Sequence, residues 1–500
     1  MFETALAQLR FAASLALGVR FSTWSLDWLV DAALATRREF GALGPDGAEL
    51  IGGPLLDEET RRAVQLRRFR TQASRAARET AYYGRVFAEL GLDPARLSEQ
   101  DVGRLPTTPK SALRDDPDAF VRRTARPYLR SLTTGTTGPS TSVYFSTYEL
   151  HLMVALSALG FLSSGQLGPE DVVQISTSSR AVLGNLGLAG ACARIGALVY
   201  VAGLVEPEQT LAMLAEQRRI PGKKRRTSVM STYPSYLGQL VECGLRLGYR
   251  PTDFGIERVF CGGEIVTAGL KERSRALFGP VDFFENYAMT ELLPLGGHLC
   301  EQGHLHFEVS HGLIEVRSLG GDNPALPGQA GTIIATPFPP YRETTLLLRY
   351  DTEDVVRALA RPLDCSLRNL PATGHLLGKR RLSVQHEDGW TFPRDVIEAL
   401  EALNAVPLPA RCGFWAVPGG VAVQVVVGED TNEARRRVGA ALEARGLPLR
   451  ELRLVEDPRS LERPLPLRGD LRETSFGLPP DGAGGSLRSP SKRDLSGRLS

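Results

Sequence analysis

The sequence predicts an α/β protein with a large N-terminal domain of helix-covered parallel sheet, a small β subdomain, and a small, mobile α+β domain at the C-terminus. Three observations support this prediction. Short β-branched runs alternate with helical stretches over residues 171–286, which is typical of a parallel sheet with helices on both faces. Strands alone follow after Gly312, and strands and helices mix again from Gly378.

Residues 1–60 are predicted to form a variable, helical N-terminal extension to which no chemistry is assigned. A helical, arginine-rich pattern follows over residues 58–92. Arginine at helical spacing usually marks a solvated face, and 59 Lys and Arg residues are balanced by 57 Asp and Glu residues. This balance creates no general field that attracts polyanions, so no nucleic-acid partner is expected.

Residues 61–377 are expected to form the large N-terminal domain and to contain the ligand site, because ligands of parallel sheets bind beyond the carboxyl ends of the strands. Strands of this sheet are expected at residues 171–177, 197–202, 227–231, 256–260 and 281–286, with helices between them, including 184–195 and 208–217. The β subdomain is expected to use strands at residues 313–317, 331–336 and 345–350.

Residues 378–475 are predicted to be the small C-terminal domain, with a helix near 393–403, a hairpin around 418–420, a helix at 431–445 and a strand at 451–455. Residues 476–500 are rich in Gly, Ser, Pro and Arg, and a disordered tail is expected there. Six scattered cysteines do not indicate a disulfide framework. Neither a signal peptide nor a membrane span is expected, which predicts a cytoplasmic protein.

A loop rich in threonine and glycine is the most distinctive stretch of the chain. Its central residues are Thr133, Thr134, Gly135, Thr136, Thr137 and Gly138. Glycine lets a ligand approach the backbone closely, and successive N–H groups with hydroxyls form a nest suited to phosphate oxygens. No Gly-Lys-Ser/Thr follows the second glycine, so the loop is not a Walker motif. If this loop is considered without the rest of the chain, a solvated turn remains the alternative.

Short motifs in the correct order resemble those of the adenylate-forming (AMP-forming) acyl/aryl-CoA synthetase superfamily, most closely its phenylacetate–CoA ligase-like branch. The resemblance covers roughly residues 60–475. Its motifs are residues 105–110, the Thr/Gly loop, Thr232 to Tyr236, Cys261 to Glu264, Tyr287 to Glu291, Arg349 to Asp354, and Gly378-Lys379.

The resemblance implies an ATP-dependent, AMP-forming ligase that adenylates an aromatic or hydrophobic carboxylic acid and transfers the acyl group to coenzyme A. The Thr/Gly loop would hold the β- and γ-phosphates, Thr290 would touch the α-phosphate, and Glu291 would hold Mg²⁺. Asp354 would accept both ribose hydroxyls. The remaining nucleotide-site residues would be Gly262, Gly263, Glu264, Tyr287, Ala288 and Lys379.

Three aromatic residues, Phe145, Tyr233 and Tyr236, are the candidates for an aromatic acyl pocket. Structural alternatives remain open for several of these side chains. Glu291 could be a helix-start carboxylate favoured by the helix dipole, Asp354 could cap a turn, and the tyrosines could be aromatic residues at the edge of the core.

Several residues depart from the pattern of the family. Pro139 stands where a lysine usually follows the loop, while Ala288 and Glu353 replace glycines. The C-terminal catalytic lysine is missing, and Arg468 is the candidate to replace its charge, with Arg463 and Lys492 as alternatives. A guanidinium is bulkier than an ammonium and forms a different set of hydrogen bonds.

These departures leave two other functions open. One is adenylation followed by transfer to an amine or to a carrier-protein thiol in a biosynthetic pathway. The other is a degenerate, non-catalytic homologue that binds a nucleotide or an acyl group. The oligomeric state is not fixed by the sequence, and a homodimer is compatible with it.

Cys300, His306 and Cys365 resemble a Cys/His zinc position of some members of this branch. A structural zinc site uses four ligands, and His304 or Cys261 could supply the fourth. Unligated cysteines and surface histidines are the alternative. The basic run Lys223 to Arg226 is interpreted as an exposed loop, with a site for the phosphates of coenzyme A as the alternative.

Overall fold

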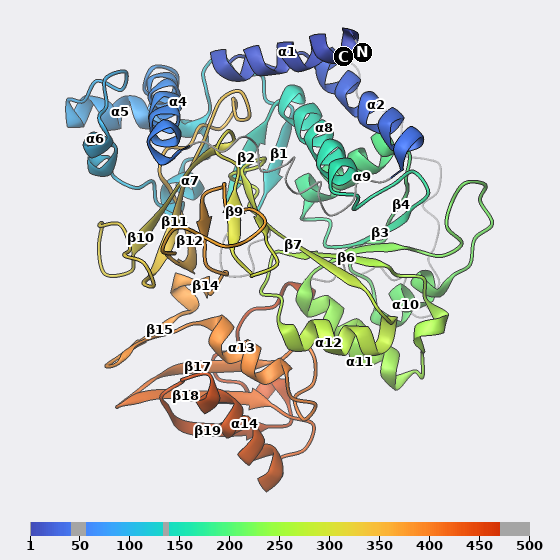
Figure 1. The fold of residues 1–500 in the computed structure, drawn as a ribbon. Coiled ribbons are helices and arrows are strands. Elements are labelled where there is room, and N and C mark those ends of the chain that lie inside the picture. The colour runs from blue at the N-terminus through green and yellow to red at the C-terminus, as the bar shows by residue number, and fades with distance from the viewer. Residues whose placement is uncertain (1, 42–56, 134–139, 471–500) are drawn as a thin grey trace, which may run out of the picture.

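The computed structural model describes residues 2–41, 57–133 and 140–470, with the N-terminal helices at one end and the C-terminal region at the other (Figure 1). The helices that precede the central sheet are α1 (Phe2–Leu17), α2 (Thr23–Phe40), α4 (Glu58–Glu79), α5 (Ala81–Leu90), α6 (Glu99–Arg104) and α7 (Lys110–Asp115). Within the described part of residues 1–60, the predicted helical structure corresponds to α1, α2 and the start of α4.

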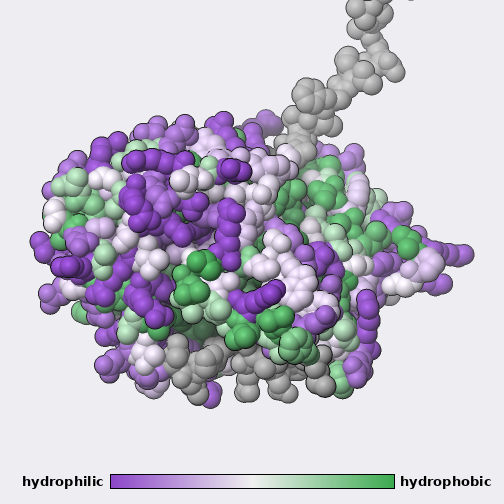
Figure 2. All heavy atoms as spheres, turned by 90° about the horizontal axis from the view of Figure 1, so that it is seen from above, coloured by the Kyte–Doolittle hydropathy of each residue, from purple (hydrophilic) through white to green (hydrophobic). Residues whose placement is uncertain are grey.

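The N-terminal extension packs on the large domain through α2. Leu26, Val30 and Leu34, at spacings of four residues, share an apolar cluster with Leu152 of α8 (Thr147–Ser163). Figure 2 looks onto the side of the molecule that carries these helices and shows hydrophobic residues interspersed with polar ones. The extension thus contributes to the core of the large domain.

An eight-stranded mixed sheet forms the centre of the molecule, in the order β13-β9-β8-β7-β6-β5-β3-β4. The strands from β7 to β4 are parallel, and β8, β9 and β13 continue the sheet antiparallel. Their bounds are β3 (Val172–Ser176), β4 (Leu198–Val201), β5 (Val229–Thr232), β6 (Arg258–Gly262), β7 (Asp282–Ala288), β8 (Gly296–Leu299), β9 (Leu305–Phe307) and β13 (Ala372–Thr373).

Helices cover both faces of this sheet, as the sequence predicts. On one face, Met230 and Val259 pack with helices α10 to α12; on the other, Val229 and Phe260 pack with α8 and α9. Adjacent strand residues reach opposite faces because side chains alternate along a strand. The covering helices are α9 (Val182–Ile195), α10 (Pro207–Ala215), α11 (Pro234–Arg246) and α12 (Ala268–Phe278).

A four-stranded antiparallel sheet, in the order β10-β11-β12-β14, is the predicted β subdomain. Its strands are β10 (Gly312–Ser318), β11 (Ala330–Pro337), β12 (Tyr350–Arg357) and β14 (Gly378–Lys379), while β1 (Leu129–Leu132) and β2 (Ser142–Phe145) form a separate hairpin.

The prediction of a strand at residues 345–350 is wrong, since β12 begins only at Tyr350. Residues 346–348 are buried leucines in the core shared with α4 and α5. Their backbone bonds leave the sheet: Leu346 N–H donates to the Phe120 carbonyl, and Leu348 N–H donates to the Tyr83 hydroxyl. An apolar run this short does not distinguish a strand from a buried connection.

Residues 378–470, which we call the C-terminal domain, have their own core of α13, α14 and a three-stranded sheet. The elements after β14 are β15 (Val384–His386), β16 (Gly389–Thr391), α13 (Pro393–Glu401), β17 (Cys412–Val417), β18 (Gly420–Val426), α14 (Asn432–Ala444) and β19 (Leu449–Val455). None of the helices in the described ranges is long and apolar enough to span a membrane.

The C-terminal domain meets the large domain where α13 contacts the start of α12. Ala268 N–H donates to Glu398 Oε1 over 2.7 Å, and the Thr267 hydroxyl donates to Glu401. Gly269 permits this approach, because a Cβ atom there would lie 2.4 Å from the Glu401 backbone carbonyl. This contact therefore holds the C-terminal domain against the large domain.

Candidate active site

A cavity of about 320 Å³ lies between the two domains, and the separate sequence motifs converge on it. It is bounded by the carboxyl ends of β6 and β7, by α7, by β12 and by the last described segment of the chain. Of the residues that the sequence assigned to a nucleotide or to catalysis, those that line it are Thr133, Gly262, Gly263, Glu264, Tyr287, Ala288, Thr290, Glu291, Asp354, Lys379 and Arg468.

Glu291 is almost fully buried in the wall of this cavity, with a side chain that is 2% exposed. Its Oε1 atom lies 3.0 Å from Lys110 Nζ and accepts a hydrogen bond from the Tyr350 hydroxyl over 3.1 Å. Burial favours the neutral acid, but the Lys110 ammonium outweighs it, so the pKa of Glu291 is lowered. The side chain is therefore a carboxylate, the form that binds a divalent cation.

Asp354 is held from both sides, and both of its oxygens have partners. The Tyr287 hydroxyl donates to Oδ2, and Lys379 Nζ lies close to Oδ1, each over 2.9 Å. Lys379 reaches this position because β14 pairs with β12 directly opposite Asp354. A carboxylate offers about four lone-pair sites, so the arrangement leaves capacity to accept hydroxyl donors.

The turn after β6 brings Gly263 and Glu264 to the C-terminal segment. Gly263 has φ of 82°, a conformation that suits glycine, and its carbonyl accepts from Arg468 Nε over 2.7 Å. Glu264 accepts from the backbone N–H groups of Ser235 and Arg468. The Arg468 guanidinium also lies over the Tyr233 ring, 5.7 Å from its centroid.

Of the three candidates to replace the missing lysine, Arg468 is thus the one that is seen to line the cavity. Arg463 is exposed and does not line it, and Lys492 lies outside the described residues. Most of the Thr/Gly loop, residues 134–139, also lies outside them, so Thr133 alone represents the loop here.

Only one of the three aromatic candidates lines the cavity. Tyr233 does so. Phe145 is buried in a separate cluster, where the Arg342 guanidinium lies over its ring, 4.2 Å from the ring centroid. Tyr236 is fully buried among α10 and α11, where its hydroxyl donates to the Val205 carbonyl. Both residues serve packing, because their side chains are buried in apolar clusters and do not line the cavity.

The sequence reasoning missed a charged cluster at the cavity wall. Glu285 lies two residues before Tyr287, on the same face of β7, and pairs with Lys271 and with His375 at 3.5 Å. These partners outweigh burial, so the pKa of Glu285 is lowered. Alternation along the predicted strand was the available signal, since it places residues 285 and 287 on one face.

Lys110 and Arg114 are two further cavity-lining cations without an assigned role in the sequence. They are four residues apart on α7 and therefore share one face of that helix. Lys110 belongs to the motif at residues 105–110, so its position in the cavity wall could have been anticipated.

Cys300, His304, His306 and Cys365 form a second cluster, away from the cavity. Their potential ligand atoms all lie within 4.8 Å of one another, and Cys365 Sγ is 3.4 Å from His306 Nε2. A tight turn closed by Cys300 N–H and the His304 carbonyl positions two of them. The structure selects His304, and not Cys261, as the fourth member of the set.

This donor set fits a tetrahedral metal site. Two thiols and two imidazoles are a common zinc ligand set. Burial lowers the pKa of His306 to about 4, so the ring is neutral and able to coordinate. The Nδ1 atom of His304 is buried without a hydrogen-bond partner among the described residues.

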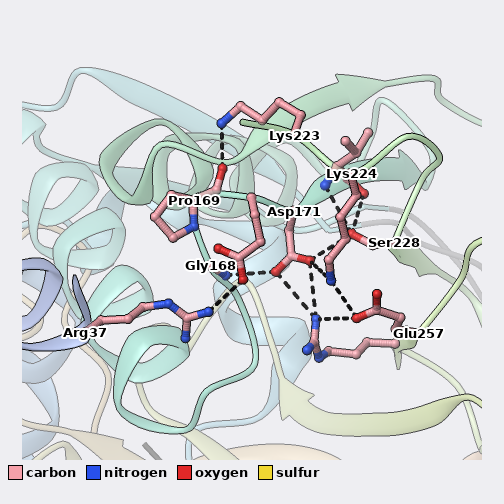
Figure 3. A network of polar contacts seen from close by, with 11 residues as sticks. Arg37, Gly168, Pro169, Asp171, Lys223, Lys224, Ser228 and Glu257 are labelled. Atoms are coloured by element: carbon pink, nitrogen blue, oxygen red, sulfur yellow. Dashed lines mark hydrogen bonds and ion pairs between the residues drawn. The ribbon is translucent and has the colours of Figure 1, made fainter. Parts of the chain in front are cut away.

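The basic run Lys223 to Arg226 is largely occupied by internal contacts (Figure 3). Lys223 Nζ donates to the Pro169 and Gly196 carbonyls, and Lys224 Nζ lies 2.8 Å from Asp171 Oδ1 and 2.6 Å from Glu257. Arg226 donates to the Thr252 carbonyl. These contacts favour a structural role over a site for the phosphates of coenzyme A.

Comparison with solved structures shows the fold of AMP-forming acyl-CoA ligases. A structure of 2-hydroxyisobutyryl-CoA ligase in the postadenylation state with 2-HIB-AMP matches with a TM-score of 0.66 over 82% of this chain and 89% of that chain, at 18% identity. Its open conformation with 2-HIB-AMP and CoA gives 0.59 over 82% and 90%, also at 18% identity.

The same ligase in the thioesterification state, with 2-HIB-AMP and CoA, gives a TM-score of 0.56 over 82% of this chain and 89% of that chain, at 18% identity. No protein-family model matches the sequence, and no curated protein sequence matches it. At this level of identity the structural likeness establishes the fold.

Proposed function

We propose that this chain is an ATP-dependent, AMP-forming ligase that adenylates an aromatic or similarly hydrophobic carboxylic acid and transfers the acyl group to coenzyme A. The observation that carries the proposal is convergence: Thr133, Glu291 and Asp354, distant in sequence, line one cavity. A nucleotide needs separate partners for its phosphates and its ribose, and a threonine hydroxyl with two carboxylates at one cavity can supply both kinds.

In the first half-reaction, an oxygen of the acid attacks the α-phosphorus of ATP and the bond to the β-phosphate breaks, giving an acyl adenylate and pyrophosphate. Asp354 would accept the ribose hydroxyls, and Tyr287 would pack against the base. Glu291 fits a Mg²⁺ ligand, because Mg²⁺ binds through one or two carboxylates together with substrate phosphates, and bound Mg²⁺ would supply charge neutralisation. Thr290 would donate its hydroxyl to the α-phosphate.

Arg468 would stabilise the negative charge that develops on the α-phosphate. Its side chain is oriented by the Gly263 carbonyl and the Tyr233 ring, so little reorganisation is needed when charge develops. Preorganised donors of this kind are worth about 10²–10³ in rate.

In the second half-reaction, the thiol sulfur attacks the acyl carbon, AMP leaves and the thiol proton passes to solvent. Coenzyme A is the acceptor that we propose, because the solved structures with this fold include complexes of a ligase with CoA. The apolar part of the cavity wall supports a hydrophobic acid. The apolar residues of this wall include Val266, Leu293, Leu299 and Leu305, together with the ring of Tyr233.

Pyrophosphate exchange with a panel of aromatic, branched and straight-chain acids tests the proposal. We expect exchange to depend on the acid and to be strongest with an aromatic or bulky apolar one, and acyl-CoA to form when CoA is added. If product forms only with an amine or a carrier protein, that compound is the acyl acceptor in place of coenzyme A. Nucleotide binding without exchange for any acid would identify a non-catalytic homologue.

We also propose that Cys300, His304, His306 and Cys365 hold a structural zinc ion. Zinc would join the turn after β8 to the loop that carries Cys365. The same two segments are already linked by Ser366, whose N–H and hydroxyl donate to Glu301 over 2.9 and 2.6 Å.

A further inference from the structure

Lys110 is one of the cavity residues to which the proposed adenylation chemistry gives no role. Its ammonium lies 3.0 Å from Oε1 of Glu291, the residue that the proposed function gives to a metal ion. The other lysine of the cavity wall, Lys379, is committed to Asp354, and Arg394 is committed to Glu398. In the described part of the chain, Lys110 is the cation that forms an ion pair with Glu291.

The backbone around Lys110 is fixed to the strand that completes the Glu291 site. Thr108 N–H donates to the Arg349 carbonyl over 2.8 Å, and its hydroxyl donates to the Leu348 carbonyl over 2.7 Å. Tyr350, the next residue along, supplies the second donor to Glu291. The start of α7 is thus rigid, and only the lysine side chain is free to change its direction.

The ammonium itself lies at the cavity surface. The Lys110 side chain is 16% exposed, against 2% for Glu291, so its four-carbon stem can rotate without exposing the acid. The residue after the Thr/Gly loop is Pro139, so the loop brings no lysine of its own to the phosphates. A phosphate chain entering beside Glu291 would meet the Lys110 ammonium, which pairs with that acid.

We propose that Lys110 is a positioning residue that exchanges partners: it pairs with Glu291 in the ligand-free protein and with the phosphate chain in the metal–nucleotide complex. The exchange keeps Glu291 charged and oriented before the substrate arrives. It also supplies the cation that the Thr/Gly loop lacks. The inference rests on the proposed nucleotide site, but it does not require that the chain complete the ligase reaction.

Calorimetric binding of α,β-methylene-ATP, in EDTA and in Mg²⁺, to the full-length protein tests the exchange. Lys110→Met removes the charge and keeps most of the stem. Without metal, the uncompensated Glu291 then repels the phosphates, so binding weakens strongly. Bound Mg²⁺ compensates Glu291 but does not replace the contact between Lys110 and the phosphates, so binding in Mg²⁺ recovers only in part and stays weaker than that of the wild type. We expect the ratio of the Kd in EDTA to the Kd in Mg²⁺ to rise at least tenfold.

Two controls separate exchange from a simple change of charge. Arg114 lies on the same face of α7 as Lys110 but forms no ion pair with Glu291. In Arg114→Met, the ratio of the Kd in EDTA to the Kd in Mg²⁺ should stay within about twofold of the wild-type ratio. The double variant Lys110→Met/Glu291→Gln should regain binding in EDTA, because neither charge is left. Thermal unfolding confirms that each variant is folded.

An unchanged ratio in Lys110→Met would overturn the proposal. Wild-type affinity of that variant in Mg²⁺ would also overturn it, because Lys110 would then be a static partner of Glu291. So would an equal rise in Arg114→Met. If the expected ratios appear while no acid supports pyrophosphate exchange, the partner exchange stands and the ligase function fails. The two claims are therefore tested separately.

Discussion

Glu353 shows how this site tolerates a residue that breaks the pattern of its motif. It replaces a glycine of the resembling family and holds a left-handed backbone, with φ of 60°, at a cost of roughly 1–2 kcal/mol. Its carboxylate has a cationic partner, since Arg381 Nη1 lies 3.6 Å away. A change that looked damaging in the sequence is thus partly offset by a neighbouring charge.

Arg468 is the residue on which adenylation should depend most clearly. We expect Arg468→Ala to lower acid-dependent pyrophosphate exchange by about 10²–10³, because it removes a preorganised charge that acts in the transition state. Arg468→Lys should retain more activity than Arg468→Ala, since the charge is kept. Arg463→Ala is the matched control in the same segment, and an equal loss in that variant would refute the assignment.

The sequence predicts the identity of the candidate site residues more readily than it predicts their ion-pair and hydrogen-bond partners. Glu291 and Asp354 were placed by their motifs, but the partners Lys110 and Lys379 follow from the pairing of α7 and β14 with β12, which no local pattern encodes. Tyr236 and Phe145 were misjudged as pocket residues. Whether an aromatic ring faces a cavity or a helix is decided by tertiary packing.

Among the secondary elements, the parallel strands were predictable and the connection before β12 was not. Alternating β-branched runs and helices indicated the sheet, because each run is short and bounded by turns. Residues 345–350 have the same apolar character, yet they cross the core and bond to side-chain and loop atoms. Only the position of Phe120 and Tyr83 distinguishes the two cases.

The turn after β8 should depend on zinc if Cys300, His304, His306 and Cys365 bind it. We expect close to one zinc per chain by elemental analysis after gentle purification, and a loss of most of it in Cys365→Ser. Thermal stability should fall in that variant, because metal binding adds to the folding free energy. Cys412→Ser, a buried cysteine remote from the cluster, is the control; zinc well below one per wild-type chain would reject the site.

Glu401 should make the stability of the domain contact depend on pH. Burial raises the pKa of this carboxyl to about 7, and the nearby Glu264 and Glu398 charges add to the rise. Between pH 4.5 and 7 the folded protein therefore holds a proton that the unfolded chain has lost. The free energy of unfolding should fall as pH rises through this window, by up to about 1.4 kcal/mol per pH unit.

Chemical denaturation at several pH values measures this effect. Glu401→Gln keeps an acceptor for Ala410 N–H and cannot ionise, so it should gain stability over the wild type at pH 8 and lose that advantage near pH 5. Glu443→Gln, an exposed change on α14, is the control. Parallel pH profiles for wild type and Glu401→Gln would contradict the assignment.

At the scale of the whole molecule, we propose that residues 61–377 and 378–475 act as two bodies that enclose the cavity. Glu291 of the first body and Arg468 of the second both line the cavity, and hydrogen bonds between α13 and the start of α12 join the two bodies. These observations support an arrangement in which both bodies contribute to the site.

Gly269 offers a test of that arrangement. A Cβ atom at this position would lie 2.4 Å from the Glu401 backbone carbonyl, so Gly269→Ala should force α12 and α13 apart while each domain keeps its own core. We expect a slower adenylation step and a larger radius of gyration by small-angle scattering. Gly439→Ala, in α14 with space around it, is the control; wild-type exchange rates in Gly269→Ala would exclude this contact from the adenylating arrangement.

The central claim is that the Glu291 and Asp354 motifs bind one nucleotide, and a crystal structure with α,β-methylene-ATP and Mg²⁺ tests it most directly. We predict the ribose hydroxyls on Asp354, the base beside Tyr287 and Gly263, and the phosphates between Glu291 and the Thr/Gly loop. A nucleotide bound elsewhere on the protein, or one that touches only one of these two acids, would contradict the account.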